Sequence, residues 1–347
     1  MSRRMLVLAA AGFLTVFLAA IAALLPVPYV SLQPGPTTNT LGAVDGKDLI
    51  RIDGRRTYPD KGHLDLVTVS VLGGPRQRLD LATALLGWLD DAKAVVPERT
   101  VYPAGQTAKQ AEAESAAEMS DSQENATTAA LRQLDIPVTT SVVVAALSPG
   151  SASTGKLEAG DVLVSVDGTP VIGGASLREA ITSKKPGDPV QLVVRRDGAE
   201  ISTTVTTGKA PDDGRAVIGV ETRDEADYPF MVEISLRDVG GPSAGLMFAL
   251  GIVDKLTPGS LTGGRFIAGT GTIDDAGTVG PIGGITQKMI GARGNGATVF
   301  LSPVENCATA KATVPDGIRL VRVDTLGDAV AALQDLEAGR TDALPRC

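Results

Sequence analysis

A serine lies in the glycine-rich segment GGPSAG at residues 240–245, where its side chain could act as a nucleophile. The paired glycines and Pro242 predict a tight turn that leads into a helix, because an apolar stretch follows from Ser243 to Leu256. The first backbone N–H groups of a helix have no partner inside it and can stabilise a developing oxyanion. Serine is also a frequent helix-capping residue, so this motif alone does not decide between the two roles.

A second glycine-rich segment, GPIGGITQK at residues 280–288, places Lys288 just inside another expected helix. Neutral lysine can accept the proton of a serine hydroxyl, and burial among apolar side chains favours the neutral form by lowering the pKa of the amine. Ile285 and Met289 can supply such surroundings. A lysine on a helix is more often simply solvated, so Lys288 alone does not indicate catalysis. It is a candidate base only together with Ser243 as a candidate nucleophile.

The remaining residue types narrow the possible chemistry. The 347-residue chain has one histidine, His63, and two cysteines, Cys307 and Cys347. A zinc site of the Cys/His type needs about four such ligands, so we expect no metal and no cofactor. His63 precedes a strand-like run and is interpreted as a surface or strand-edge residue. Whether the two cysteines pair outside the cell is left open.

Charge and motif content exclude two further classes. The net charge is −8, which argues against a nucleic-acid partner because such proteins normally present a basic face. The sequence contains no G-x-x-x-x-G-K-[ST] phosphate loop, so we expect no use of ATP by this chain.

The N-terminus predicts a membrane anchor. Residues 5–25 are apolar apart from a glycine and a threonine, and at about 1.5 Å per residue they span about 30 Å, one hydrocarbon core. Arg3 and Arg4 place the N-terminus in the cytoplasm and the rest of the chain outside. A cleaved signal peptide is the alternative interpretation.

Several segments must position these groups. Residues 26–40 contain four prolines within eleven residues and are expected to form an extended connector that leaves the membrane. Alternation over 64–71 predicts a strand, and residues 107–134, rich in Ala, Glu and Gln, predict a helix with a solvated acidic face. A terminal helix is expected over 326–336.

The block from 137 to 208 resembles a bacterial PDZ domain. The resemblance rests on SPGSA at 148–152, LEAGDVLVSVDG at 157–168 and KPGDPVQLVVRRDG at 185–198. It implies binding of peptides by strand addition. The glycine-containing loop that would bind a terminal carboxylate is not evident in residues 134–137, and we name no site residues there.

The segments around Ser243 and Lys288, together with AGTGTI at 268–273 and GATVFLSPVENC at 296–307, resemble the Lon-type serine-lysine peptidase domain. The resemblance implies that Ser243 is the nucleophile, Lys288 the general base and Thr270 a residue that orients the lysine. Gly240, Thr272 and Thr286 replace charged residues of Lon proteases proper. With the anchor and the PDZ-like block, the overall resemblance is to membrane-anchored PDZ/Lon-type peptidases of Gram-positive bacteria.

These observations predict an α+β protein with an N-terminal transmembrane helix (1–25), a connector and N-terminal segment (26–136), a PDZ-like module (137–208) and a Lon-type proteolytic domain (215–347). Strands on the two sides of the PDZ-like block are expected to pair, so that it interrupts the peptidase domain. The expected function is an ATP-independent serine endopeptidase that cleaves exposed or unfolded polypeptides at the outer face of the cell membrane. The alternative is a non-enzymatic PDZ scaffold with an inert peptidase fold. Oligomerisation is compatible with the sequence but not specified by it.

Overall fold

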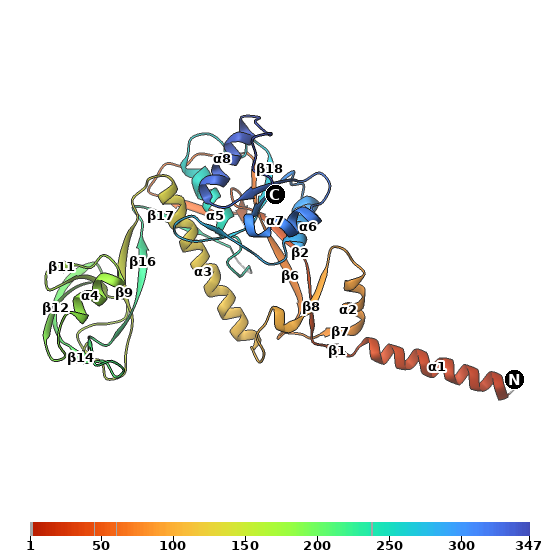
Figure 1. The fold of residues 1–347 in the computed structure, drawn as a ribbon, viewed down its shortest axis with the longest axis horizontal. Helices are drawn as coiled ribbons and strands as arrows, with labels where there is room; N and C mark the ends of the chain where they lie inside the picture. Colours follow the sequence, from red (N-terminus) through yellow and green to blue (C-terminus); the bar gives the residue numbers. More distant parts are fainter. Residues whose placement is uncertain (1–2, 45, 60, 237–238) are drawn as a thin grey trace. The chain divides into compact units, whose positions relative to one another are not determined.

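The computed structural model describes residues 3–44, 46–59, 61–236 and 239–347. The chain divides into two compact units, and the first is assembled from two separate stretches, 1–135 and 230–347. The second unit, residues 136–229, lies between these stretches in the sequence. Helices and strands are mixed in both units, which confirms the predicted α+β class (Figure 1).

The first unit is built on a six-stranded sheet in which four neighbouring strands, β6, β18, β21 and β22, pair in parallel. Strand β2 runs antiparallel to them, and β8 pairs antiparallel with β2 at the edge of the sheet. Strand 6 precedes the second unit in the sequence and strand 18 follows it, and the two pair in parallel from His63 opposite Phe266 to Leu66 opposite Gly269. The two stretches of the first unit therefore share one sheet. In spatial order its strands are β22 (Arg319–Val323), β21 (Val299–Pro303), β18 (Phe266–Gly269), β6 (His63–Gly73), β2 (Tyr29–Asn39) and β8 (Ala94–Pro97).

Helices pack around this sheet. The most deeply buried is α5 (Gly245–Leu256), in which every residue except Lys255 is buried. Both α3 and α8 begin with a capping box, formed by Thr107 with Gln110 and by Thr325 with Asp328. The other helices of this unit are α2 (Leu81–Trp88), α3 (Ala108–Gln133), α6 (Ile285–Gly294), α7 (Cys307–Thr313) and α8 (Leu326–Glu337).

Residues 26–40 are extended as predicted, but they are not a free connector. Most of them form β2, which lies inside the sheet between β6 and β8. The prolines are tolerated because the register shifts between Pro34 and Thr37, and a bulge is a position where proline does not disrupt the ladder. A side chain at Gly35 would lie 2.3 Å from the hydroxyl of Thr68, so only glycine fits this bulge.

Short two-stranded pairs and one long helix complete the first unit. The pairs are β1 (Pro26–Val27) with β7 (Leu79–Asp80), β3 (Ala43–Val44) with β4 (Lys47–Asp48), β5 (Ile50–Asp53) with β17 (Met231–Ile234), and β19 (Thr272–Ile273) with β20 (Val279–Gly280). The helix α1 (Arg3–Ala23) has no buried residue. Among the described residues it alone is long and apolar enough to cross a membrane.

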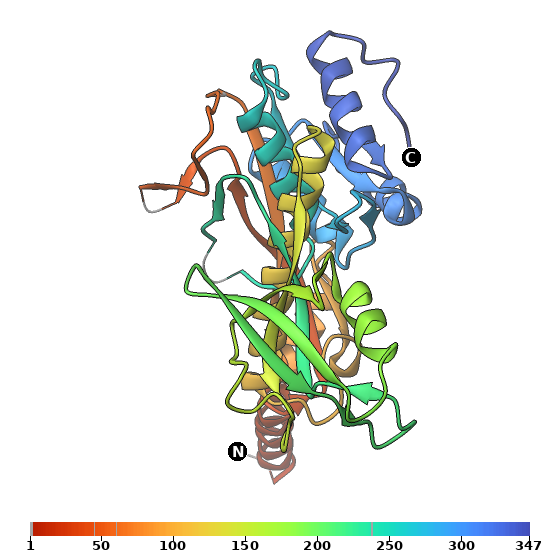
Figure 2. The ribbon, with the colours of Figure 1, turned by 90° about the vertical axis from the view of Figure 1, so that its left-hand side faces the viewer.

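The second unit contains a sheet in the order β13-β12-β10-β9-β16 and one helix, α4 (Gly174–Thr182) (Figure 2). It extends past residue 208, where the sequence placed the end of this module, because β16 pairs with β9 along its whole length. Its strands are β9 (Thr139–Leu147), β10 (Val162–Val166), β11 (Thr169–Pro170), β12 (Pro189–Arg196), β13 (Ala199–Thr206), β14 (Gly208–Lys209), β15 (Ala216–Val217) and β16 (Val220–Asp227).

Candidate active site

Ser243 lies in the turn that leads into α5. The helix begins at Gly245 with Ala244 as its capping residue, so Ser243 stands just before the helix and not inside its first turn. The hydroxyl of Ser243 does not cap α5, because its partner is the amine of Lys288. Gly241 has φ +83°, a left-handed conformation that favours glycine, and this bend projects Ser243 away from the incoming chain.

Helix α3 holds this turn in place. The backbone N–H of Gly241 donates to the carbonyl of Ser115 at 3.0 Å, and the hydroxyl of Ser122 donates to the carbonyl of Pro242 at 3.0 Å. A side chain at Gly240 would lie 2.0 Å from the Ser115 hydroxyl, so the close approach of the turn to α3 requires glycine there. A solvated acidic face was expected on α3, and no pattern in the sequence pointed to these two supporting serines.

Lys288 enters the site from α6. The helix is preceded by Gly284 with φ +66°, and a side chain at Gly284 would lie 2.7 Å from Val69 on β6. This glycine therefore lets the start of α6 lie close against the sheet. Lys288 is only 3% exposed. Its Nζ donates to Ser243 Oγ at 2.7 Å and to Thr270 Oγ1 at 2.8 Å. The structure thus brings together all three residues singled out in the sequence.

Thr270 orients this contact. It directly follows β18 and is buried, and its hydroxyl donates to the backbone carbonyl of Ser243 at 2.9 Å. Because that bond uses the only hydrogen of the hydroxyl, the Thr270 oxygen can only accept from Lys288. When the amine is neutral, its lone pair is therefore free to accept the hydrogen of the Ser243 hydroxyl.

Burial controls the charge of Lys288. Desolvation lowers the pKa of its amine from the ordinary 10.5 to about 7, because the charged form loses its hydration inside the protein. Neighbouring Ile285 and Met289 are buried in the same apolar cluster. A lysine with a pKa near 7 is partly neutral at physiological pH, which is the form that can act as a base.

Backbone donors lie beside the serine hydroxyl. The carbonyl of Ser243 accepts from Thr270 and also from the N–H of Gly271 at 2.9 Å, which fixes the orientation of this peptide. The N–H groups of Ser243 and Ala244 have no acceptor in the part of the chain that the structure describes. They stand just ahead of the positive end of α5 and could donate to an oxyanion that forms on a group attacked by Ser243.

His63 lies away from this site. It is the first residue of β6 and pairs with Phe266, the first residue of β18, whereas Thr270 follows the last residue of β18. At about 3.3 Å per residue, roughly 13 Å of strand separates the two ends. The imidazole stacks on Phe266 at 4.1 Å, as a strand-edge histidine would. No group of three or more potential metal ligands occurs among the residues described.

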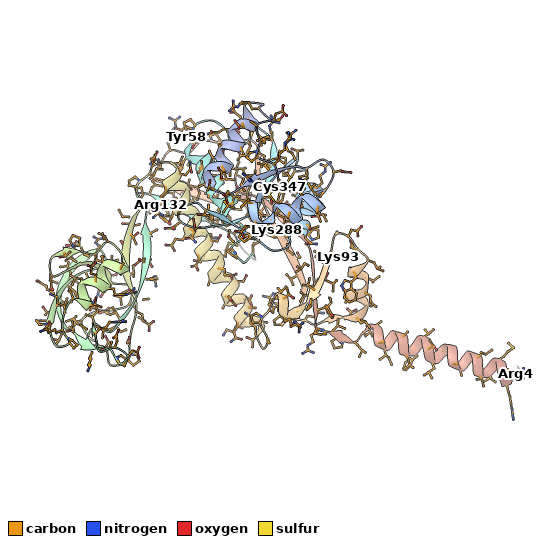
Figure 3. All side chains as sticks on the ribbon, in the orientation of Figure 1. Arg4, Tyr58, Lys93, Arg132, Lys288 and Cys347 are labelled. Carbon is orange, nitrogen blue, oxygen red and sulfur yellow. A yellow bond between two sulfur atoms is a disulfide. The ribbon has the colours of Figure 1, made fainter. Side chains whose placement is uncertain are left out.

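The loop that precedes Lys288 is braced from α7. The side-chain amide of Asn306 accepts from the backbone N–H of Ile282 and donates to its carbonyl, both at 2.9 Å. The next residue, Cys307, forms a disulfide with Cys347, the last residue of the chain (Figure 3). The pairing that the sequence left open thus ties the C-terminal tail to the helix that supports the lysine loop.

The second unit carries a separate hollow of about 900 Å³. It lies between the turn at 148–152, the segment 208–222 that leads into β16, and one face of α4 with Leu177, Arg178 and Ile181. Strand β16 is at the edge of its sheet. Gly219, with φ +70°, turns the chain just before β16.

Two family models match the chain. The model of the PDZ domain matches residues 117–207, and the model of the Lon protease (S16) C-terminal proteolytic domain matches residues 237–333. The second range includes Ser243, Thr270 and Lys288. The first range begins inside α3 and ends before β16, so it is offset from the compact unit at 136–229.

Curated relatives match in parts. Lon protease 1 from Sorangium cellulosum is 37% identical over 106 residues, which cover 30% of this chain and 13% of that protein. The Lon protease of Syntrophomonas wolfei is 31% identical over 149 residues, which cover 42% of this chain and 18% of that protein. A probable periplasmic serine endoprotease DegP-like from Pseudomonas savastanoi is 40% identical over 74 residues, covering 21% and 15%. The chain therefore spans less than a fifth of the length of each of these relatives.

Among solved structures, the PDZ domain of the SdrC-like protein from Listeria monocytogenes is 22% identical and has a TM-score of 0.23. The match covers 23% of this chain and 85% of that one.

Proposed function

Because the chain carries both a PDZ domain and the C-terminal proteolytic domain of the Lon protease (S16) family, we propose that it is a serine endopeptidase with Ser243 as nucleophile and Lys288 as general base. The observation that carries this proposal is the 2.7 Å contact between Ser243 Oγ and a buried lysine whose pKa is about 7. Such a lysine can take a proton at neutral pH without assistance from a histidine.

The geometry supports acyl transfer in two steps. As Ser243 Oγ forms a bond to the carbonyl carbon of the substrate, its proton passes to Lys288 Nζ, and the oxyanion accepts from the free backbone N–H groups. The ammonium then returns the proton to the departing amine as the peptide bond breaks. In the second step a water molecule takes the place of the amine and attacks the acyl carbon while its proton passes to Lys288. The ammonium returns that proton to Ser243 Oγ as the ester bond breaks and the acid leaves. Thr270 keeps the amine in place throughout.

Polypeptides are the substrates that the surroundings suit best. Two hollows of about 670 and 1140 Å³ are both lined by Val239, four residues before Ser243, and by Ala116 of α3. An extended segment that reached Ser243 could place side chains in them. Since the sequence has no phosphate loop, we expect substrates that are already unfolded or exposed, and cleavage without ATP.

Labelling of Ser243 separates this enzyme from an inert scaffold. We expect a fluorophosphonate probe to modify wild-type protein at Ser243, faster at pH 8 than at pH 6, and not to modify Ser243→Ala. Casein, used as an unfolded protein substrate, should be cleaved at the same rate with or without ATP and with or without EDTA. If Ser243 remained unlabelled in folded protein at both pH values, the non-enzymatic scaffold would be the better description. A strict need for ATP would instead remove the ATP-independent part of the proposal.

We place the enzyme at the outer face of the cell membrane. Helix α1 has the length and composition of a membrane span, and Arg3 and Arg4 at its start favour a cytoplasmic N-terminus. Residues after it would then lie outside, where a disulfide between Cys307 and Cys347 is stable.

The hollow of the second unit is proposed to bind substrate peptides as an added strand on β16. Its free edge offers backbone hydrogen bonds, and Leu177 and Ile181 of α4 offer an apolar wall. We expect a labelled decapeptide ending in valine to bind the full chain and to bind Ile181→Glu at least tenfold more weakly, as judged by fluorescence anisotropy. An amidated peptide tests terminus capture, since equal binding would indicate internal strand addition. No binding of either peptide would contradict the assignment.

A further inference from the structure

Helix α2 presents apolar side chains to solvent on the first unit. Leu86 is 67% exposed and Leu89, just after the helix, is 83% exposed. No charged residue occurs from 81 to 89, and the buried side of α2 is formed by the small residues Ala84 and Gly87. Contiguous apolar exposure of this kind marks an interaction site. We call this surface the α2 patch, and it consists of Leu85, Leu86, Trp88 and Leu89.

The chain fixes where the α2 patch lies relative to α1. Helix α1 ends at Ala23, and the next residues pair with the segment that leads into α2, Val27 opposite Leu79. The N–H of Leu81, the first residue of α2, donates to the carbonyl of Leu25 at 3.0 Å. A hydrogen bond thus joins the first residue of α2 to Leu25, which lies two residues after the end of α1. This keeps α2 close to the end of α1 whatever the tilt of α1 in the membrane.

The chemistry of the α2 patch suits a lipid interface. Tryptophan is enriched at the level of lipid headgroups, and Trp88 has its indole N–H satisfied by the carbonyl of Val95 at 3.2 Å. Two of the three flanking carboxylates are engaged within the protein, and the third, Asp91, is exposed. Asp80 accepts from the N–H of Thr83 at 2.8 Å, and Asp90 pairs with Lys93 at 3.1 Å. Attraction would therefore come from apolar burial and not from anionic headgroups.

We propose that α2 is an interfacial helix that inserts the α2 patch into the outer leaflet next to α1. The inference rests on the proposed membrane helix and adds a second point of contact to it. A single helix followed by a short linker would let the first unit rotate freely over the bilayer. A second inserted element removes most of that freedom and fixes which face of the sheet is turned towards the membrane.

Trp88 is the only tryptophan of the chain, so its fluorescence reports on the α2 patch alone. The full chain is reconstituted in phosphatidylcholine vesicles with or without bromine at acyl carbons 6 and 7. Insertion by about 5–10 Å places the indole near these bromines, so we expect a roughly twofold loss of emission and a shift to shorter wavelength. The double variant Leu86→Glu, Leu89→Glu should abolish both effects. Ile172→Glu, at an equally exposed apolar residue of the second unit, should leave them unchanged.

Extraction with alkaline carbonate tests the membrane helix separately. If the chain stays with the vesicles but bromine does not quench Trp88, α1 anchors the protein and the α2 patch does not touch lipid, which overturns this inference alone. If carbonate releases the chain, both proposals fail. Protection of Trp88 from acrylamide without quenching by bromine, increasing with the ratio of protein to lipid, would assign the α2 patch to a second copy of the chain and would also overturn it.

Discussion

Replacing Ser243 with alanine, or Lys288 with arginine or methionine, is expected to lower kcat/KM for an unfolded protein substrate by roughly ten-thousand-fold or more, because nucleophile and base act as one unit. Arginine keeps the positive charge but its guanidinium stays protonated and cannot take the Ser243 proton. The wild-type rate should rise with pH through about 7, where Lys288 loses its proton. Initial rates of cleavage between pH 5.5 and 9 measure both effects.

Two comparisons sharpen this result. The double variant Ser243→Ala, Lys288→Met should be no slower than either single variant, because loss of either residue already abolishes catalysis by the pair. Thr270→Val removes only the hydroxyl that orients the amine, and we expect a loss of about 2 kcal/mol, or roughly 30-fold, which Thr270→Ser should restore. Substantial turnover by Lys288→Arg at neutral pH would show that another residue is the base.

Lys288→Met is expected to produce a protein that is inactive but more stable than the wild type. In the unfolded chain the lysine pKa is the ordinary 10.5, and in the folded protein it is about 7. This difference corresponds to a destabilisation of roughly 5 kcal/mol, as an upper limit, at pH values below about 7. The wild type should therefore gain stability as pH rises from 7 towards 10.5, since the unfolded state binds more protons over this range. Methionine should remove that dependence.

Urea unfolding at pH 6, 8 and 10, followed by the fluorescence of Trp88 in the same unit, measures the difference. The gain from Lys288→Met should be largest at pH 6, reach a few kcal/mol at most, and shrink as pH approaches 10. Lys311→Met, at an exposed lysine of α7, should show no such trend. A Lys288→Met protein less stable than the wild type at pH 6 would mean that the contacts of the ammonium outweigh its desolvation.

The two halves of the site were visible in the sequence because their positioning is local. Glycines in a left-handed conformation, Gly241 and Gly284, lie within four residues of Ser243 and Lys288, the residues that they help to position. The support from Ser115 and Ser122 was not visible, because these contacts join segments more than one hundred residues apart and serine carries no long-range pattern. Thr270 came from the family resemblance alone, and its double role as donor and acceptor depends on three-dimensional geometry.

In the fold, too, local features were predicted from the sequence and features that depend on distant contacts were not. Composition predicted α3, and the expected bounds of both α3 and α8 agree with the structure to within two residues at either end. The expected pairing across the inserted block agrees with β6 beside β18. Strand β2 was taken for a connector because Pro34 and Gly35 oppose a regular ladder. The bulge that accommodates them depends on Thr68 of the neighbouring strand, whose position no local pattern reveals. The PDZ-like module was expected to end at 208, close to the end of the PDZ match at 207, whereas the compact unit continues to 229. The extra strand β16 was not predicted, since it reads as a polar segment of eight residues.

The disulfide between Cys307 and Cys347 makes the stability of the folded protein depend on the compartment in which it resides. It closes a segment of 40 residues, and on a chain-entropy account a loop of this length stabilises the folded state by about 4 kcal/mol. In a reducing cytosol both thiols would stay free, and the tail that ends beside α7 would be held only by contacts such as the one from Arg322 N–H to the carbonyl of Pro345. In newly made chains, Asn306 and the loop before Lys288 that it holds would thus become fully rigid only after export. Maturation would then be timed by oxidation of these two thiols.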